Sequence, residues 1–191
     1  KKGITMGENL SNSKVPILIK SYYNMSKIYR DLGHQEKERN NLNKALELGG
    51  KILLEIDNLE AASFYNDMAK VYKGLEKYEE SLNYEQKVFE IYKEIFGEGN
   101  PRLNISFNDM ADLEFELGNY DKALCLAYNA LSLSEKILEP DHIYFAKVQS
   151  NLAKIFIAQG KIKDAKLSLA RTILIFEDSL EPTNPSLINS Y

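Results

Sequence analysis

The sequence predicts an all-α protein, a right-handed superhelical solenoid of antiparallel helix hairpins. Three observations support this prediction. A segment recurs four times along the 191 residues, each copy carries apolar side chains at helical spacing, and glycines or prolines stand where helices should end or begin. A single hairpin cannot bury both of its apolar faces, so we expect successive hairpins to stack.

The recurring segment is clearest in the first helix of each expected hairpin. It reads SYYNMSKIYRDLGH, SFYNDMAKVYKGLEKY, SFNDMADLEFELGNY and SNLAKIFIAQGKI. A bulky column and the small column after it keep steps of 43, 42 and 42 residues. These columns are Met25, Met68, Met110 and Leu152, followed by Ser26, Ala69, Ala111 and Ala153. Because two columns share one spacing, we interpret the segment as a true repeat.

The repeat sets the expected boundaries. We predict repeats at 15–57, 58–100, 101–142 and 143–184, and residues 185–191 begin a fifth repeat that the chain end truncates. Residues 1–14 form a polar lead-in, with the end of an upstream repeat as one interpretation. The expected helices lie at 15–32, 35–56, 59–74, 78–96, 101–117, 120–138, 143–159 and 162–180.

Glycine is expected at the end of the first helix in each hairpin. Gly33, Gly118 and Gly160 stand just after the last apolar residue, and glycine adopts left-handed backbone angles without a Cβ clash. The second repeat has Glu76 at this position and Gly74 two residues earlier. We therefore expect the turn of the second repeat to be shifted or strained.

Small residues should mark the places where two helices cross closely. The small column continues on the second helices as Ser81, Ala123 and Ala165. The first repeat has Glu38 in this column, which predicts a looser first hairpin. The third repeat has Glu114 where the other repeats have an aromatic residue, so that core position departs from the pattern.

Composition narrows the class of partner. The chain has 24 basic and 28 acidic side chains and a net charge of −4, so it lacks the basic excess that nucleic-acid binding requires. No apolar run approaches the length of a membrane span, and the polar start contains no signal-peptide core. The single cysteine, Cys125, excludes an internal disulfide framework. We expect a cytoplasmic protein with no nucleic-acid or membrane partner.

Groups that could carry out catalysis are scarce. His34 and His142 both fall in expected turns, far apart in the sequence, and Cys125 has no histidine near it in the sequence. The sequence contains no phosphate-binding glycine loop, no HExxH and no CxxC. We therefore predict no enzyme activity, no cofactor and no metal.

The pattern within each repeat resembles the tetratricopeptide repeat (TPR). The third repeat carries it as Phe107, Met110, Ala111, Gly118, Tyr120, Ala123, Ala130 and Leu131. That family usually repeats about every 34 residues. The longer period here, and the repeat ends FGEGNP, LEPDHI and LEPTNP, resemble the long-hairpin variant of kinesin light chain and its bacterial relatives. The resemblance covers about residues 15 to 191 and implies a TPR-like solenoid whose concave groove, lined by first helices, binds a protein or peptide.

The resemblance also implies binding residues in this groove. Asparagines at matching positions bind peptide backbone in kinesin-light-chain-like arrays, because an amide donates and accepts hydrogen bonds at once. The matching residues here are Asn24, Asn66, Asn108 and Asn151. The alternative is that these asparagines brace neighbouring helices.

Two further columns of the first helices should line the groove. They are Lys27, Lys70, Asp112 and Lys154, and Arg30, Lys73, Phe115 and Ile157. They predict a locally basic groove in an acidic protein, interrupted at Asp112, with apolar contacts at Phe115 and Ile157. The alternative is a solvated helix face with no ligand.

The sequence therefore favours a scaffold that binds a protein or peptide segment bearing acidic residues in its concave groove. Two other functions stay open: a structural spacer or self-associating array, and a regulatory arm of an enzyme whose catalytic part lies outside this sequence. The sequence predicts no particular oligomeric state.

Overall fold

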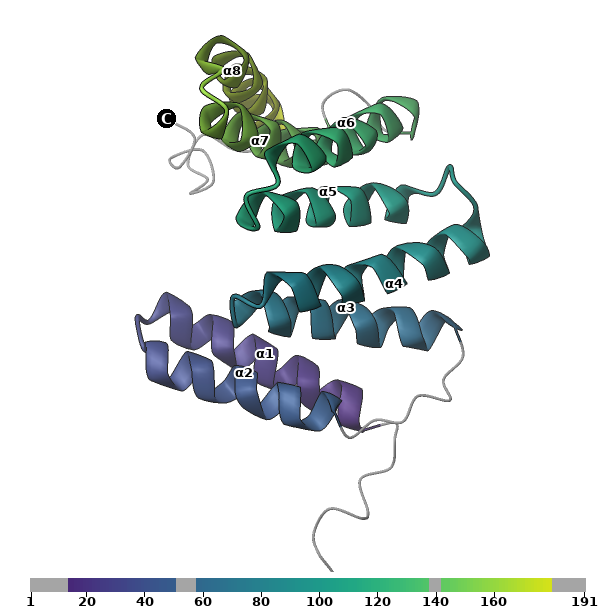
Figure 1. Cartoon of the computed structure of the whole chain (residues 1–191), viewed down its shortest axis with the longest axis vertical. Coiled ribbons are helices and arrows are strands. Elements are labelled where there is room, and N and C mark those ends of the chain that lie inside the picture. Colours follow the sequence, from purple (N-terminus) through teal and green to yellow (C-terminus); the bar gives the residue numbers. More distant parts are fainter. Residues whose placement is uncertain (1–13, 51–57, 138–141, 180–191) are drawn as a thin grey trace, which may run out of the picture. The chain divides into compact units, whose positions relative to one another are not determined.

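The computed structural model describes residues 14–50, 58–137 and 142–179, and every regular element in these ranges is an α-helix (Figure 1). The helices are α1 (Val15–Asp31), α2 (Gln35–Gly49), α3 (Asn58–Gly74), α4 (Tyr78–Phe96), α5 (Pro101–Glu116), α6 (Tyr120–Ile137), α7 (Ile143–Ala158) and α8 (Ile162–Ser179). The prediction of an all-α protein built from helix hairpins is confirmed.

One helix end differs clearly from its prediction. We expected the second helix to reach residue 56, but α2 ends at Gly49, and residues 51–57 lie outside the described residues. Two consecutive glycines, Gly49 and Gly50, weaken the helix here, because glycine loses the most backbone freedom on ordering. Gly49 also packs closely against α3, since a Cβ at this position would overlap the sulfur of Met68 and the Met68 side chain would have to shift.

The chain forms two compact units, Lys1–Val88 and Phe89–Tyr191, which we call the first and second units. In the first unit, apolar side chains of α1, α2 and α3 make one core. Its buried members are Val15, Ile19, Leu42, Ala45, Phe64, Met68 and Val71. The close crossing of α3 and α4 occurs at the small column, where the Ser81 hydroxyl donates to the Ala69 carbonyl at 2.8 Å.

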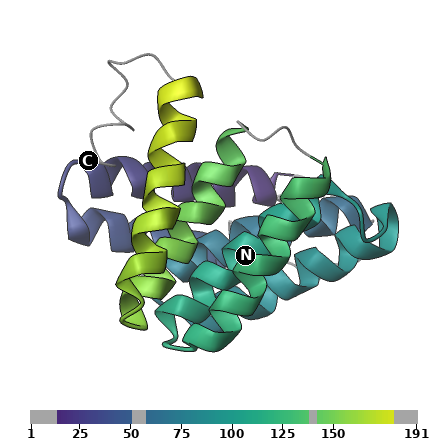
Figure 2. The same cartoon turned by 90° about the horizontal axis from the view of Figure 1, so that it is seen from above.

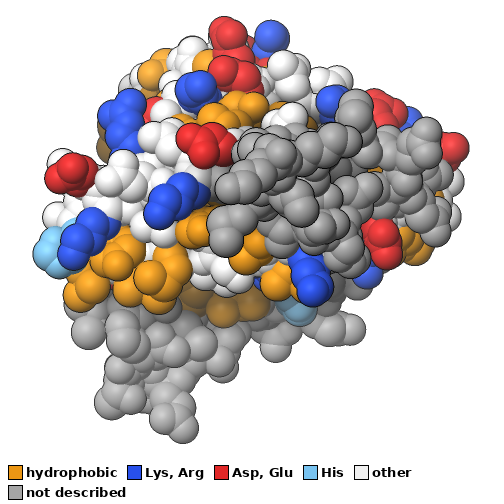
Figure 3. All heavy atoms as spheres, turned by 90° about the horizontal axis from the view of Figure 1, so that it is seen from below, with side chains coloured by type: hydrophobic (Ala, Val, Ile, Leu, Met, Phe, Trp, Pro, Cys, Tyr) orange, Lys and Arg blue, Asp and Glu red, His pale blue; other side chains and the backbone are white. Residues whose placement is uncertain are grey.

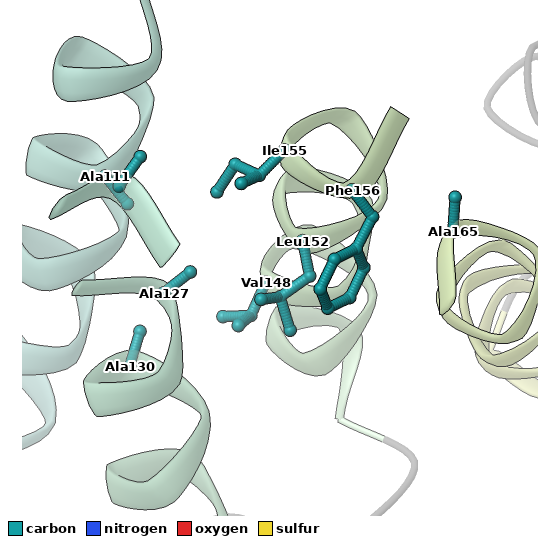
Figure 4. Packing of buried hydrophobic residues seen from close by; sticks show 9 residues of the cluster. Ala111, Ala127, Ala130, Val148, Leu152, Ile155, Phe156 and Ala165 are labelled. Carbon is teal, nitrogen blue, oxygen red and sulfur yellow. The ribbon is translucent and has the colours of Figure 1, made fainter. Parts of the chain in front are cut away.

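The core of the second unit joins an alanine-rich surface to an aliphatic one. Figure 4 shows Ala111, Ala127 and Ala130 on one side and α7 on the other. From α7, Val148, Leu152 and Ile155 extend toward these alanines, and Phe156 lies on the side of Ala165. Side chains as small as alanine let the helix backbones approach closely, as the small columns predicted. Figure 2 shows the same helices from above.

All four hairpins described turn in the same way. Gly33, Gly118 and Gly160 have φ of 72°, 78° and 73°, and Glu76 takes the equivalent position with φ of 60°. At each turn this residue's N–H bonds three residues back and the next N–H bonds five residues back, for example Lys77 to Tyr72 at 3.0 Å. The second turn is thus strained, as expected, but it is not shifted.

Gly74 has a separate role inside α3. A Cβ on this residue would lie 3.1 Å from both terminal methyl groups of Leu42 on α2. The glycine of the second repeat therefore serves the packing of α2 on α3, and the turn itself is left to Glu76.

Both acidic departures from the repeat pattern gain polar partners. Glu38 accepts from Arg30 with 2.6 Å between Nε and Oε1, so an ion pair takes the place of a small residue between α1 and α2. Glu114 is buried on α5 and accepts from the Asn119 side-chain amide at 2.7 Å. A carboxylate at the aromatic position is tolerated there because the turn supplies a hydrogen-bond donor.

Candidate peptide-binding surface

In the first unit, the predicted groove residues lie on two neighbouring helices, α1 and α3. Lys27 and Lys70 are exposed, Asn24 is exposed, and Asn66 is half-buried. The two helices contact each other directly, so these positions share one side of the unit. The two helices thus present the charged side chains of Lys27 and Lys70 and the exposed amide of Asn24.

An acidic residue that sequence reasoning missed lies on this surface. Asp67 of α3 is close enough to Lys70 and to Lys20 of α1 to interact with both charges. Burial raises the pKa of the Asp67 carboxyl, and the two ammonium groups partly offset this rise. Lys20, which we had not assigned to the groove, thus adds a further positive charge to the surface.

Two of the predicted groove cations of the first unit, Arg30 and Lys73, contribute less exposed charge than the other lysines. The Arg30 guanidinium is engaged with Glu38 across the first hairpin, so its charge is largely neutralised locally. Lys73 is half-buried on α3. The exposed positive charge therefore centres on Lys20, Lys27 and Lys70.

In the second unit, the structure brings the predicted residues of α5 and α7 into direct contact. The Asn151 amide donates to the Asn108 side-chain oxygen at 3.0 Å, and Asn108 is buried. Lys154 pairs with Asp112, with 3.5 Å between Nζ and Oδ1. In this structure the asparagines of the second unit brace two first helices, which was the alternative to peptide binding.

The apolar groove residues of the second unit differ in exposure. Phe115 is half-buried, and its ring packs on Tyr120 with centroids 5.5 Å apart. Ile157 is exposed on α7 and is free to contact a ligand. This unit therefore presents apolar surface beside a neutralised ion pair, without the net positive charge of the first unit.

A buried polar cluster beneath α5 was also missed. Asn104 is 1% exposed, and its amide donates to the Ser134 hydroxyl of α6 at 2.6 Å. The backbone carbonyl of Asn104 accepts from the Tyr144 hydroxyl of α7 at 2.8 Å. The repeat alignment carried a signal, because Asn104 stands where other repeats have Ala62 and Ala146. The cluster ties α5, α6 and α7 together and has a structural role.

The histidines and the cysteine do not assemble into a reactive site. His142 precedes α7, where its Nδ1 accepts from the Tyr144 N–H at 3.1 Å, and Cys125 is exposed on α6. Within the described ranges, no group of three or more His, Cys, Asp or Glu side chains is placed to hold a metal ion. Among the same residues, no helix has the length and apolar character needed to cross a membrane.

Comparison with protein families identifies the repeat. The tetratricopeptide repeat family matches residues 59–133 and 102–178, and a further match to a tetratricopeptide repeat covers residues 19–48. No curated protein sequence matches the chain.

Several solved structures share the fold. A Podosopora anserina protein named for kinesin light chain, with nearly identical TPR-like repeats, superimposes with a TM-score of 0.64 at 20% identity over 93% of this chain and 82% of its own. BtubC (BKLC) from P. vanneervenii gives 0.58 at 20% identity, over 89% of this chain and 68% of its own. Aspartyl phosphate phosphatase F from Bacillus subtilis gives 0.67 at 21% identity, over 89% of this chain but 43% of its own.

Proposed function

Because the chain belongs to the tetratricopeptide repeat family, we propose that it is a protein-interaction scaffold that binds an extended partner segment on the exposed side of its first helices. Helical repeat arrays bind partners on the extended concave surfaces that stacking creates. The observation that carries the proposal is the group of exposed lysines on α1 and α3 in a chain whose net charge is negative. The segment is expected to carry acidic residues.

The two units should contribute different interactions to peptide binding. Lys20, Lys27 and Lys70 would attract and orient a carboxylate on the first unit, because complementary charges steer association and fix register. On the second unit the Lys154–Asp112 pair is already neutral, so binding there would depend on the exposed side chain of Ile157. Acidic residues of the partner should therefore contact the first unit.

A charge-reversal experiment tests this assignment. Peptides selected from a random library on the whole chain should be rich in Asp and Glu, and their binding should weaken several-fold in the variant Lys27→Glu with Lys70→Glu. The loss should be greatest at low salt, where screening is weakest. Lys44→Glu with Lys77→Glu is the matched control, since it makes the same change in net charge on second helices and the turn before them.

The comparison of the two double variants decides the result. If both weaken the selected peptides equally, the effect is one of net charge and the ligand does not use this surface. If the selected peptides are not enriched in Asp and Glu, the proposal that the partner carries acidic residues is wrong, whether or not the peptides bind on the first helices.

One observation favours a second candidate function, self-association. The outward side of α1 exposes Met25 and Ile28, which are 40% and 52% exposed. The equivalent residues of α3, Met68 and Val71, are 1% and 0% exposed because α2 covers them. Figure 3 shows a face of the molecule on which hydrophobic and basic side chains lie together. An apolar helix face of this kind is a candidate contact between copies of the chain.

Sedimentation velocity over a range of concentrations tests this second candidate. Self-association through α1 predicts a concentration-dependent increase in mass that Ile28→Lys abolishes. Ile105→Lys, a matched change at an exposed isoleucine of α5, should leave the mass distribution unchanged. A monomer at all concentrations contradicts the self-associating array.

A further inference from the structure

In the second unit a furrow runs along α7 on the side away from Lys154. The helices α6 and α8 both pack on α7 and form the two walls, and Phe145, Gln149 and Phe156 of α7 form part of the floor. Two hollows of about 400 and 330 Å³ open along it. Both are lined by Leu131, Gln149 and Arg171, so they are parts of one continuous feature.

The furrow is hollow because this repeat lacks aromatic rings that fill it elsewhere. The position of Gln149 holds Tyr22, Tyr65 and Phe107 in the three preceding repeats. In the first unit the Tyr65 ring packs on Tyr84, with centroids 5.8 Å apart. In the second unit the Phe107 ring packs on Phe89, with centroids 4.9 Å apart.

At the furrow, both rings of the preceding repeat are absent. Gln149 stands where that repeat has Phe107, and Leu131 stands where it has Phe89, while Ser168 takes the place of the smaller aliphatic Leu126. Leu131 and Ser168 line the hollow on opposite walls. Side-chain volume is thus lost on the floor and on both walls relative to the preceding repeat, which leaves the hollow.

Polar groups in the furrow are available to a ligand. Gln149 lines both hollows, and its side-chain amide has no hydrogen bond to another residue in the part of the chain that the structure describes. Arg171, on the α8 wall, forms no ion pair with Glu135 or any other described carboxylate. An amide that lines both hollows and an unpaired guanidinium can each form a hydrogen bond with a ligand.

We propose that this furrow is a second peptide-binding site, distinct from the surface of the first helices. It binds a partner segment that carries a bulky apolar side chain next to an acidic one. The apolar side chain occupies the hollow between Leu131, Phe145 and Leu174, and the carboxylate pairs with Arg171. The Gln149 amide bonds the backbone between them, because it donates and accepts at once.

The charges set the direction of the segment. Glu135 lines the first hollow together with Phe145 and Leu174, so it disfavours a carboxylate of the ligand at that end. The second hollow is lined by one further cation and one further anion, Lys161 and Asp164, whose charges oppose each other. Arg171 borders both hollows, so the acidic residue lies between them and the apolar residue lies toward Glu135.

Titration of the whole chain with blocked alanine-based peptides tests the site. The probes contain Phe-Asp, Phe-Lys or Ala-Asp, and binding is followed by NMR at the Arg171 Nε–H and the Leu131 methyl groups. We expect Phe-Asp to shift both signals and to bind at least about tenfold more tightly than either control peptide. Equal binding of Phe-Asp and Phe-Lys would overturn the assignment of Arg171, and no shift with any probe would overturn the site.

Two variants separate binding from folding. Gln149→Phe restores the ring that the preceding repeat has at this position, so the chain should melt at the same or a higher temperature while the Phe-Asp shifts disappear. Arg171→Gln should retain binding through the hollow but lose the preference for Asp over Lys. Lys27→Glu with Lys70→Glu should leave Phe-Asp binding unchanged, which distinguishes this site from the first-helix surface. Wild-type Phe-Asp binding by Gln149→Phe would exclude the furrow.

Discussion

Replacing Glu76 by glycine should stabilise the protein. Glu76 has φ of 60°, and the structure places glycine at the equivalent position of the other three turns. A side chain other than glycine in the left-handed region destabilises the folded state by about 1–2 kcal/mol. Glycine removes this strain, but its greater freedom in the unfolded chain offsets about 0.5–1 kcal/mol of the gain. The variant Glu76→Gly should therefore gain roughly 1 kcal/mol.

Equilibrium unfolding in urea measures this effect. The midpoint for Glu76→Gly should rise while the slope of the transition stays unchanged, since the folded contacts are the same. Gly118→Ala provides the mirror experiment, because φ is 78° there and a Cβ would meet nothing within 4 Å. It should lose about 1 kcal/mol, which is the strain of an alanine at positive φ less the entropy that alanine removes from the unfolded chain. A lower midpoint for Glu76→Gly would show that the carboxylate at this turn stabilises the fold, and the strain argument would fail.

Two further substitutions test packing and electrostatics. Ala111→Leu should lower the urea midpoint by an amount equivalent to about 1–3 kcal/mol, because Ala111 is 0% exposed at a helix crossing with no room for extra methylenes; an unchanged midpoint would mean that the crossing is not tight. Asp67→Asn should stabilise the chain at neutral pH, because burial raises the pKa of Asp67 and the folded state thus holds the proton more tightly than the unfolded state. Wild type should lose stability relative to Asp67→Asn as pH rises from acid through the raised pKa, and a stability difference that is the same at all pH values would contradict this.

Much of the architecture could be predicted because helix signals are local. Apolar spacing, prolines at helix starts and glycines after helix ends depend on residues a few positions apart, and the observed helix ends agree with the expected ones except at α2. Repetition strengthened the prediction of each helix, because the same pattern of residues occurs in all four repeats. At α2 the predicted helix end was wrong because the apolar pattern continues past the glycine pair Gly49 and Gly50. The close contact of Gly49 with Met68 could not be predicted, because Met68 lies on another helix.

The candidate site was predictable only in part. The helical period identified which residues share the exposed side of a first helix, but it could not show what each side chain meets on the next one. The bonds Asn151–Asn108 and Lys154–Asp112 join residues 43 and 42 positions apart, close to one repeat. Whether such residues meet depends on how the helices are packed, and the Lys154–Asp112 contact pairs the cation of the predicted groove columns in the second unit.

The sequence by itself determined the class of the fold, the repeat and the helix positions, because hydrophobic periodicity and backbone preferences act within one helix. Only the tertiary structure decided which polar groups are paired and which remain available to a ligand. It showed that Asp67 interacts with lysines of α1 and α3, and that a furrow lies where the rings of Phe107 and Phe89 in the preceding repeat have been replaced by Gln149 and Leu131. Cavities and charge pairs arise between helices, where the distances that govern them are set by the packing of all the side chains together.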